Sequence, residues 1–151
     1  MRAGLWMVAG GAALVAGPLA AAGGSLWHYS FQNGIGEYLT GVWDAPTGGA
    51  LNLSCKDGGV TIMAQIKGQA PPANSALKLV ASSRAGASES VFTTDAQGAV
   101  PIVDAAGSGA FARLWGDLRA RDIVTLRYAD GRWAVLSLAG AQKTLPRTPC
   151  G

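Results

Sequence analysis

The chain has 151 residues, of which 49% are hydrophobic and 14% charged, and its formal net charge is +3. This length fits one domain with its own core, and this composition excludes a largely disordered chain. So small a positive charge does not by itself indicate nucleic-acid binding, and we expect no nucleic-acid partner.

Residues 1–22 have the pattern of a secretory signal peptide. A basic residue, Arg2, precedes an apolar stretch from Leu5 to Val15, and a run of three alanines ends at Ala22. We therefore expect cleavage, export to the periplasm or the medium, and a single exported domain over residues 23–151. An uncleaved segment would instead anchor the chain, because about 20 residues span a bilayer, and only in that case do we expect membrane contact.

Cys55 and Cys150 are the only cysteines of the chain. Thiols tend to oxidise in exported proteins, so the sequence predicts one disulfide between them. The bond would attach the C-terminus to the domain and contribute on the order of 4 kcal/mol by the chain-entropy estimate.

Apolar and polar residues alternate in the first part of the predicted domain, which is typical of strands. Leu26–Phe31 is the first predicted strand, with one buried face. Gly34 and Gly36 then interrupt the pattern, and Tyr38–Trp43 resumes it before a turn rich in glycine and proline.

A hairpin is predicted where Leu51–Cys55 and Val60–Ile66 flank Asp57-Gly58. The Asp-Gly pair suits the two positive-φ positions of a type I′ turn. In this register Cys55 faces Val60 on the buried side.

The middle of the chain continues the strand pattern. Gly68–Asn74 is a predicted connector, and a strand from Leu77 to Arg84 follows it. Two shorter strands are predicted at Val91–Thr94 and Ala99–Val103. Because Pro101 cannot donate a ladder hydrogen bond, we expect the last of these at a sheet edge.

Two helices are predicted in the last third of the chain. Between Ser108 and Leu118 the apolar residues have the i, i+3, i+4, i+7 spacing of one helix face. They are Phe111, Leu114, Trp115 and Leu118. A short helix is expected from Ala139 to Leu145, capped by Ser137 and followed by prolines.

A second hairpin is predicted between these helices, from Asp122–Tyr128 and Arg132–Leu138 around Asp130-Gly131. Its expected register places Arg127 opposite Ala134. The expected core face consists of Val124, Leu126, Tyr128, Trp133 and Val135.

These elements predict an α+β fold that is mainly β. We expect a small bent antiparallel sheet or sandwich, with one crossing helix and a short C-terminal helix.

Residues for catalysis are few. His28 is the only histidine and lies inside a predicted strand, so we assign no catalytic residue of the serine-hydrolase type. One histidine and two distant cysteines match no zinc spacing, and we expect no metal and no cofactor. Glu37 and Glu89 leave one enzymatic alternative, a small carboxylate-dependent hydrolase, which requires the two carboxyl groups within about 10 Å of each other.

Two groups of residues are candidates for binding. Five arginines close in sequence would form a basic patch if their side chains converge, and a solvated mixed face if they do not. They are Arg113, Arg119, Arg121, Arg127 and Arg132. Aromatic residues near the predicted mature start are either core or an exposed platform for a sugar or peptide. They are Trp27, Tyr29, Phe31, Tyr38 and Trp43.

The segment from Phe111 to Leu145 resembles the C-terminal part of the invasion-associated locus B family of small exported bacterial proteins. The similarity rests on Leu114-Trp115-Gly116-Asp117-Leu118, on the Asp130-Gly131 turn and on Ser137-Leu138-Ala139-Gly140-Ala141. The cysteine placement and Ala141, where an aromatic residue is expected, depart from that family. The resemblance implies a periplasmic β-rich domain without enzymatic activity and carries over no catalytic residue.

We therefore expect a non-enzymatic exported domain that binds an envelope protein or an anionic polymer as an accessory or inhibitor. The alternatives are the hydrolase described above and a membrane-tethered structural component of the envelope.

Overall fold

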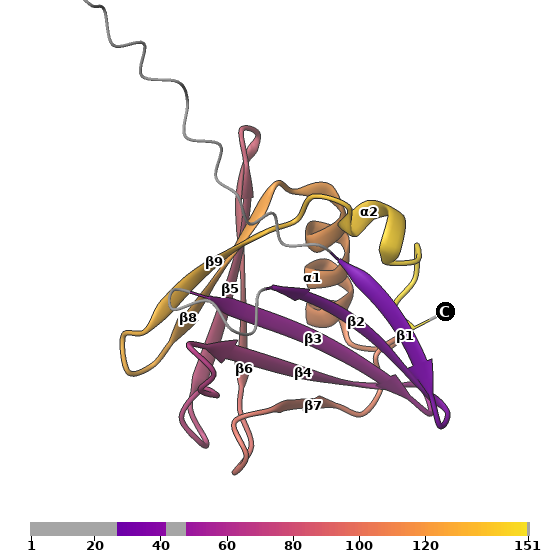
Figure 1. Cartoon of the computed structure of the whole chain (residues 1–151), viewed down its shortest axis with the longest axis horizontal. Helices are drawn as coiled ribbons and strands as arrows, with labels where there is room; N and C mark the ends of the chain where they lie inside the picture. Colours follow the sequence, from indigo (N-terminus) through magenta and orange to yellow (C-terminus); the bar gives the residue numbers. More distant parts are fainter. Residues whose placement is uncertain (1–26, 42–47, 151) are drawn as a thin grey trace, which may run out of the picture.

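The computed structural model describes residues 27–41 and 48–150, and its strands form two antiparallel sheets (Figure 1). The predicted signal peptide and Trp43 lie outside the described residues. The first sheet has the strand order β1-β2-β3-β4-β7 and consists of β1 (His28–Gln32), β2 (Ile35–Gly41), β3 (Gly49–Lys56), β4 (Gly59–Ile66) and β7 (Val100–Ile102). The second sheet has the order β6-β5-β8-β9 and consists of β5 (Ala76–Ser83), β6 (Gly86–Thr93), β8 (Ile123–Tyr128) and β9 (Trp133–Ser137).

Two helices, α1 (Gly109–Ala120) and α2 (Ala141–Thr144), complete the described part of the chain. The fold is thus mainly β with two short helices, as the sequence predicted. None of the helices in residues 27–41 and 48–150 has the length and apolar character needed to cross a bilayer.

The core lies on one side of each sheet and is completed by α1. Alternate residues of the strands face it, because successive side chains of a strand point to opposite sides. The largest fully buried side chains are Trp115, Phe111, Leu51, Leu53, Ile62, Leu77, Leu79, Leu114, Leu118, Leu126, Leu136 and Leu145.

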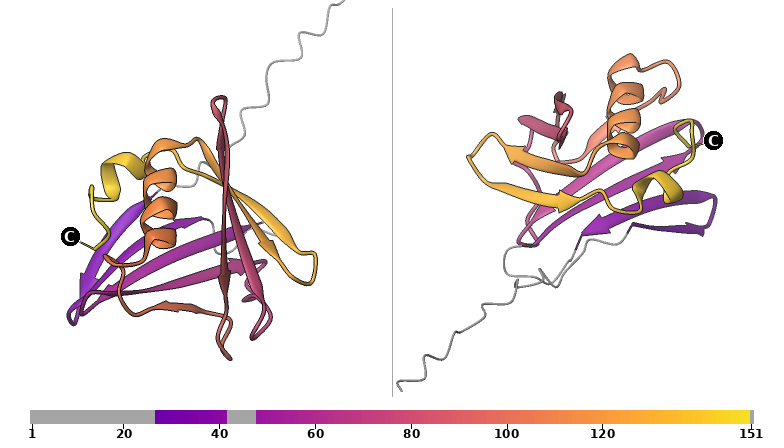
Figure 2. Two further views of the ribbon diagram at one scale, coloured as in Figure 1. Left: turned by 180° about the vertical axis from the view of Figure 1, so that it is seen from behind. Right: turned by 90° about the horizontal axis from the view of Figure 1, so that it is seen from above.

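Helix α1 forms where the apolar spacing predicted it, and the four residues of the predicted face are buried. The Ser108 hydroxyl accepts a hydrogen bond from the Phe111 amide at 3.3 Å, which is the usual role of an N-cap serine. The helix lies between β5 and the β1–β2 hairpin (Figure 2), and the Trp115 ring meets the Tyr38 ring edge to face at 5.4 Å. The Trp115 indole N–H donates to the carbonyl oxygen of Pro146 at 2.8 Å, so α1 also holds the C-terminal segment.

The first predicted strand exists, but the expectation of a buried face on it is wrong. In β1 no side chain is buried, and Tyr29 and Phe31 are 50% and 63% exposed. The strand β2 also begins earlier than predicted and includes Gly36. A Cβ atom at Gly36 would lie 3.2 Å from the Tyr29 hydroxyl, so this glycine leaves room for the ring of the paired strand rather than interrupting the sheet.

The β3–β4 hairpin confirms its prediction. Asp57 and Gly58 have φ values of 50° and 80°, as a two-residue type I′ turn requires, and Cys55 pairs with Val60. Cys55 forms a disulfide with Cys150, with the two Cα atoms 5.6 Å apart. The disulfide joins the end of this hairpin to the C-terminal segment.

The next two predicted strands separate into different sheets. β6 pairs with β5 and begins at Gly86, earlier than predicted. The prediction missed this start because the first five residues of β6 lack the alternation of large apolar and polar side chains. β7 pairs with β4 at the edge of the first sheet, and Pro101 lies within it as expected.

The β8–β9 hairpin has a register one residue away from the predicted one. Its loop has three residues, 129–131, because the Gly131 amide donates to Tyr128 and the Tyr128 amide donates to Arg132. Arg127 therefore pairs with Trp133, not with Ala134. A shift of one residue exchanges the two faces of a strand, so Ala134 and Leu136 enter the core while Trp133 and Val135 are 65% and 47% exposed.

The short C-terminal helix is present but begins later than predicted. Gly140, with a φ of 88°, precedes its first residue, Ala141. The Ser137 hydroxyl accepts from the Ala139 amide at 3.1 Å, so it stabilises the approach to α2 rather than its first turn.

Candidate functional site

The outer face of the β6-β5-β8-β9 sheet carries exposed apolar and cationic side chains. Cross-strand pairing places Lys78 opposite Arg127, and Arg127 opposite Trp133. Two residues further along the strands, Thr125 pairs with Val135 on the same face. We call this group, Lys78, Thr125, Arg127, Trp133 and Val135, the Trp133 surface.

A hollow of about 610 Å³ lies on the β8–β9 part of this face. It is lined by Thr125, Arg127, Tyr128, Gly131, Arg132, Trp133 and Val135. A second hollow of about 270 Å³ lies beside it and is also lined by Trp133, together with Ile66, Lys67, Gly131 and Arg132. Trp133 therefore borders both hollows.

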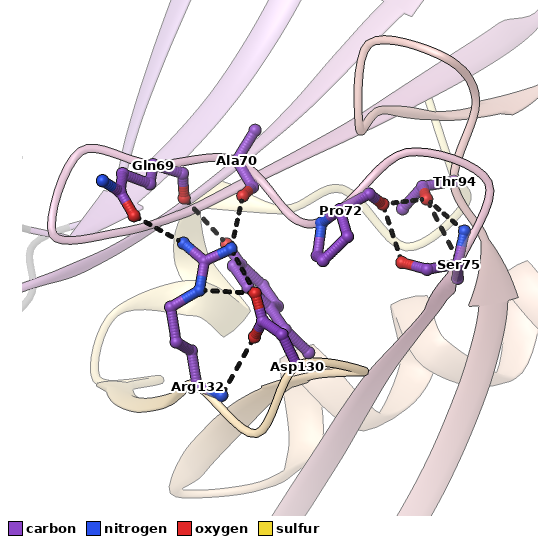
Figure 3. Close-up of polar contacts among 8 residues, drawn as sticks. Gln69, Ala70, Pro72, Ser75, Thr94, Asp130 and Arg132 are labelled. Atoms are coloured by element: carbon purple, nitrogen blue, oxygen red, sulfur yellow. Dashed lines mark hydrogen bonds and ion pairs between the residues drawn. The ribbon is translucent and has the colours of Figure 1, made fainter.

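Arg132 holds the β8–β9 loop in place through contacts with its own hairpin and with the connector after β4 (Figure 3). Its Nε donates to an Asp130 carboxylate oxygen at 2.8 Å, and its two Nη atoms donate to the Gln69 side chain at 3.0 Å and the Ala70 carbonyl at 3.1 Å. Its guanidinium carbon lies 4.9 Å from the centre of the Tyr128 ring, within cation–π distance. These contacts occupy the guanidinium group and fix the loop from which β9 starts.

The same contacts shift the ionisation of the groups around the loop. The hydrogen bond from Arg132 holds the pKa of the Asp130 carboxyl below its ordinary value, and the same bond raises the pKa of Arg132. Burial raises the pKa of Tyr128, whose hydroxyl donates to the Gln69 carbonyl at 3.4 Å. The loop therefore keeps its ion pair at neutral pH, and Tyr128 stays protonated.

The five arginines of the predicted basic patch do not converge on one site. Arg119 donates to the Leu145 carbonyl at 3.1 Å, and Arg121 forms an ion pair with Asp117 at 3.5 Å and donates to the Ser83 hydroxyl at 3.3 Å. Both therefore join α1 to its neighbours. Arg113 is exposed on α1. Only Arg127 and Arg132 line the larger hollow, and among the described residues Arg127 has no ion pair.

The two glutamates of the hydrolase alternative lie in different sheets and contact different partners. Glu37 is in β2 and accepts a hydrogen bond from the Asn52 side-chain amide at 3.2 Å. Glu89 is in β6 and pairs with Lys78 at 3.6 Å. His28 is exposed on β1.

The aromatic residues near the predicted mature start divide between the core and the surface. Trp27 and Tyr38 are buried, and the Tyr29 ring lies 4.9 Å from the Tyr38 ring. Phe31 is exposed. The aromatic residue of the Trp133 surface was not among the candidates, because the predicted register assigned it to the core.

A comparison with protein families gives one match, to the YfjT family over residues 25–145. The chain belongs to the YfjT family. The range of the YfjT match includes every described strand and both helices. No curated protein and no solved structure matches the chain. The resemblance to the invasion-associated locus B family stays a prediction, because the YfjT match does not test it.

Proposed function

We propose that this chain is an exported, non-catalytic domain that binds another component of the cell envelope through the Trp133 surface. Export is supported by the signal-like pattern of residues 1–22 and by the Cys55–Cys150 disulfide, which is compatible with an oxidising compartment.

The observation that carries the proposal is the exposure of Trp133 next to Arg127 on an open sheet face. Tryptophan and arginine are the residue types most enriched among residues that dominate binding energy. Trp133 is 65% exposed, and an indole left in water keeps apolar area that a partner can bury. Val135 and Thr125 extend this area along the hairpin.

The scaffold supports this role because it holds the surface rigidly. Leu126, Ala134 and Leu136 anchor the other face of the hairpin in the core. Arg132 fastens its loop to residues 69 and 70. A preformed surface loses little conformational entropy on binding, which favours affinity.

The proposal is tested by co-sedimentation of the purified protein with insoluble envelope material from the producing cell. We expect Trp133→Ser to lower the bound fraction at least ten-fold. Phe31→Ser is the matched control, because Phe31 is 63% exposed but belongs to the other sheet. Equal binding by Trp133→Ser and the unchanged protein would contradict the proposal.

Export is tested separately by the intact mass of the protein recovered from the envelope fraction, with and without reduction and thiol alkylation. We expect a species that starts near Gly23 and has no alkylatable thiol before reduction. A full-length species with two free thiols would contradict export as a soluble domain and favour the membrane-tethered alternative.

A further inference from the structure

We propose that the ligand of the Trp133 surface is an acidic polysaccharide, with a sugar ring stacked on the Trp133 indole and a carboxylate bound between Arg127 and Lys78. This inference rests on the proposed function and names the chemical class of its ligand.

The cationic part of the surface is arranged for an anion. Lys78 and Arg127 are direct cross-strand neighbours, and residues in such pairs have Cβ atoms about 4.5–5.5 Å apart. Like charges at this spacing destabilise a sheet. Glu89 offsets Lys78 at 3.6 Å, but Arg127 has no ion pair among the described residues. A carboxylate from a ligand would neutralise this pair, and the guanidinium fork binds carboxylates with two parallel hydrogen bonds.

The apolar part of the surface lies directly beside the cations. Trp133 is the cross-strand neighbour of Arg127 on the side opposite Lys78. The row Lys78, Arg127, Trp133 therefore presents two cations followed by a flat aromatic ring. The C–H face of a sugar ring packs on an indole, while a carboxylate on the same or the next sugar reaches the guanidinium group.

The two hollows that Trp133 borders favour a polymer over a single sugar. Arg127 lines the larger hollow and Lys67 the smaller one, so each of the two hollows has an exposed cation on its lining together with Trp133. A chain of acidic sugars that crosses Trp133 can place one anionic group in each hollow. A single monosaccharide can occupy only one.

An acidic peptide satisfies only part of this arrangement. Its carboxylates can pair with Arg127 and Lys78, but it has no ring that must stack on Trp133. The acidic polysaccharide uses both the charge and the exposed indole, and this difference separates the two ligand classes in an experiment.

The test is calorimetric titration of the mature protein with three defined polymers at low and at moderate salt. Polygalacturonate carries the ring and the charge, its methyl ester carries the ring alone, and poly-L-glutamate carries the charge alone. We expect polygalacturonate to bind, more weakly as salt rises. We expect the methyl ester and poly-L-glutamate to bind at least ten-fold more weakly.

Variants assign the binding to the surface. Trp133→Ala and Arg127→Gln should each weaken polygalacturonate binding at least ten-fold. Arg113→Gln is the matched control for charge, since Arg113 is exposed on α1 and should leave binding unchanged. Circular dichroism and thermal melting establish that each variant is folded.

Three outcomes would overturn the inference in different ways. Equal binding of poly-L-glutamate would assign the surface to an acidic protein. Absence of polygalacturonate binding, with envelope binding still dependent on Trp133, would keep the proposed function and reject the ligand class. Loss of dependence on Trp133 in both assays would reject the proposed function as well.

Discussion

The two hairpins that contain an Asp-Gly pair differ in loop length and therefore in register. In β3–β4 the pair is the whole loop, and both of its residues have positive φ. In β8–β9 Ala129 joins the loop, only Gly131 has positive φ, and the register moves by one residue. The same dipeptide thus gives two registers, and the second one turns Trp133 outward.

The hairpins also differ in how their ends are held. The disulfide fastens the end of β3 to the C-terminal segment. The Arg132 contacts with Asp130, Gln69 and Ala70 fasten the β8–β9 loop. The β3–β4 hairpin is therefore stabilised by a covalent bond. The β8–β9 hairpin, which presents Trp133 at the surface, is held by hydrogen bonds and an ion pair instead.

The largest expected effect is the difference in stability between replacing Trp115 in the core and replacing Trp133 on the β8–β9 hairpin. Trp115 is 1% exposed, and Trp115→Ala should lower the free energy of unfolding by about 3–5 kcal/mol, the usual range for a buried tryptophan. Trp133→Ala should change it by no more than about 0.5 kcal/mol, as surface substitutions do. Urea unfolding of both variants measures the difference. Similar losses would mean that Trp133 is in the core, as the sequence alone predicted.

Removing the Cys55–Cys150 disulfide should cause the next largest loss of stability. Cys55→Ser, Cys150→Ser and the double variant should each lower the free energy of unfolding by about 2–4 kcal/mol under oxidising conditions, because the unfolded chain gains conformational freedom. Thermal melting with and without a reductant measures this. The unchanged protein should respond to the reductant and the variants should not, and unchanged melting of the variants would contradict a stabilising role.

A smaller loss of stability than that of the cysteine variants is expected when the glycines of the two turns are replaced. Gly58 and Gly131 have φ values of 80° and 88°, and an added Cβ atom would meet nothing within 4 Å at either position. Gly58→Ala and Gly131→Ala should therefore each cost about 1–2 kcal/mol, the cost of a left-handed conformation for a residue with a side chain. Chemical denaturation measures the cost.

The two glycine variants should differ in binding. Gly131→Ala strains the loop that sets the register of Trp133 and should weaken co-sedimentation with envelope material. Gly58→Ala is the matched control and should not. Equal weakening by both variants would show that the register of β8–β9 has no special role.

Much of the fold was predictable because local signals agreed with one another. Four features follow from short patterns with one physical interpretation: the β3–β4 hairpin, α1, the edge position of Pro101 and the cysteine pair. The start of β6 was missed because small polar residues carry no periodic signal.

The candidate site was not predictable from periodicity, because β9 is apolar on both faces. Trp133 and Val135 alternate with Ala134 and Leu136, so either set can be assigned to the core. The signal that decides is the loop, since a three-residue loop that ends in glycine gives the observed register. The sequence also could not show that the five arginines are dispersed. Three of them, Arg113, Arg119 and Arg121, lie on α1 or at its end, and their neighbours depend on how α1 packs.

The central claim is that the outer face of β8–β9 is the part of this domain that meets the envelope. Hydrogen–deuterium exchange of the protein alone and bound to insoluble envelope material tests it most directly, with peptides resolved by mass after release. We predict slower exchange confined to residues 123–137 and the adjoining part of β5. Slower exchange at β1–β2 instead, or no difference between the free and the bound protein, would contradict the account.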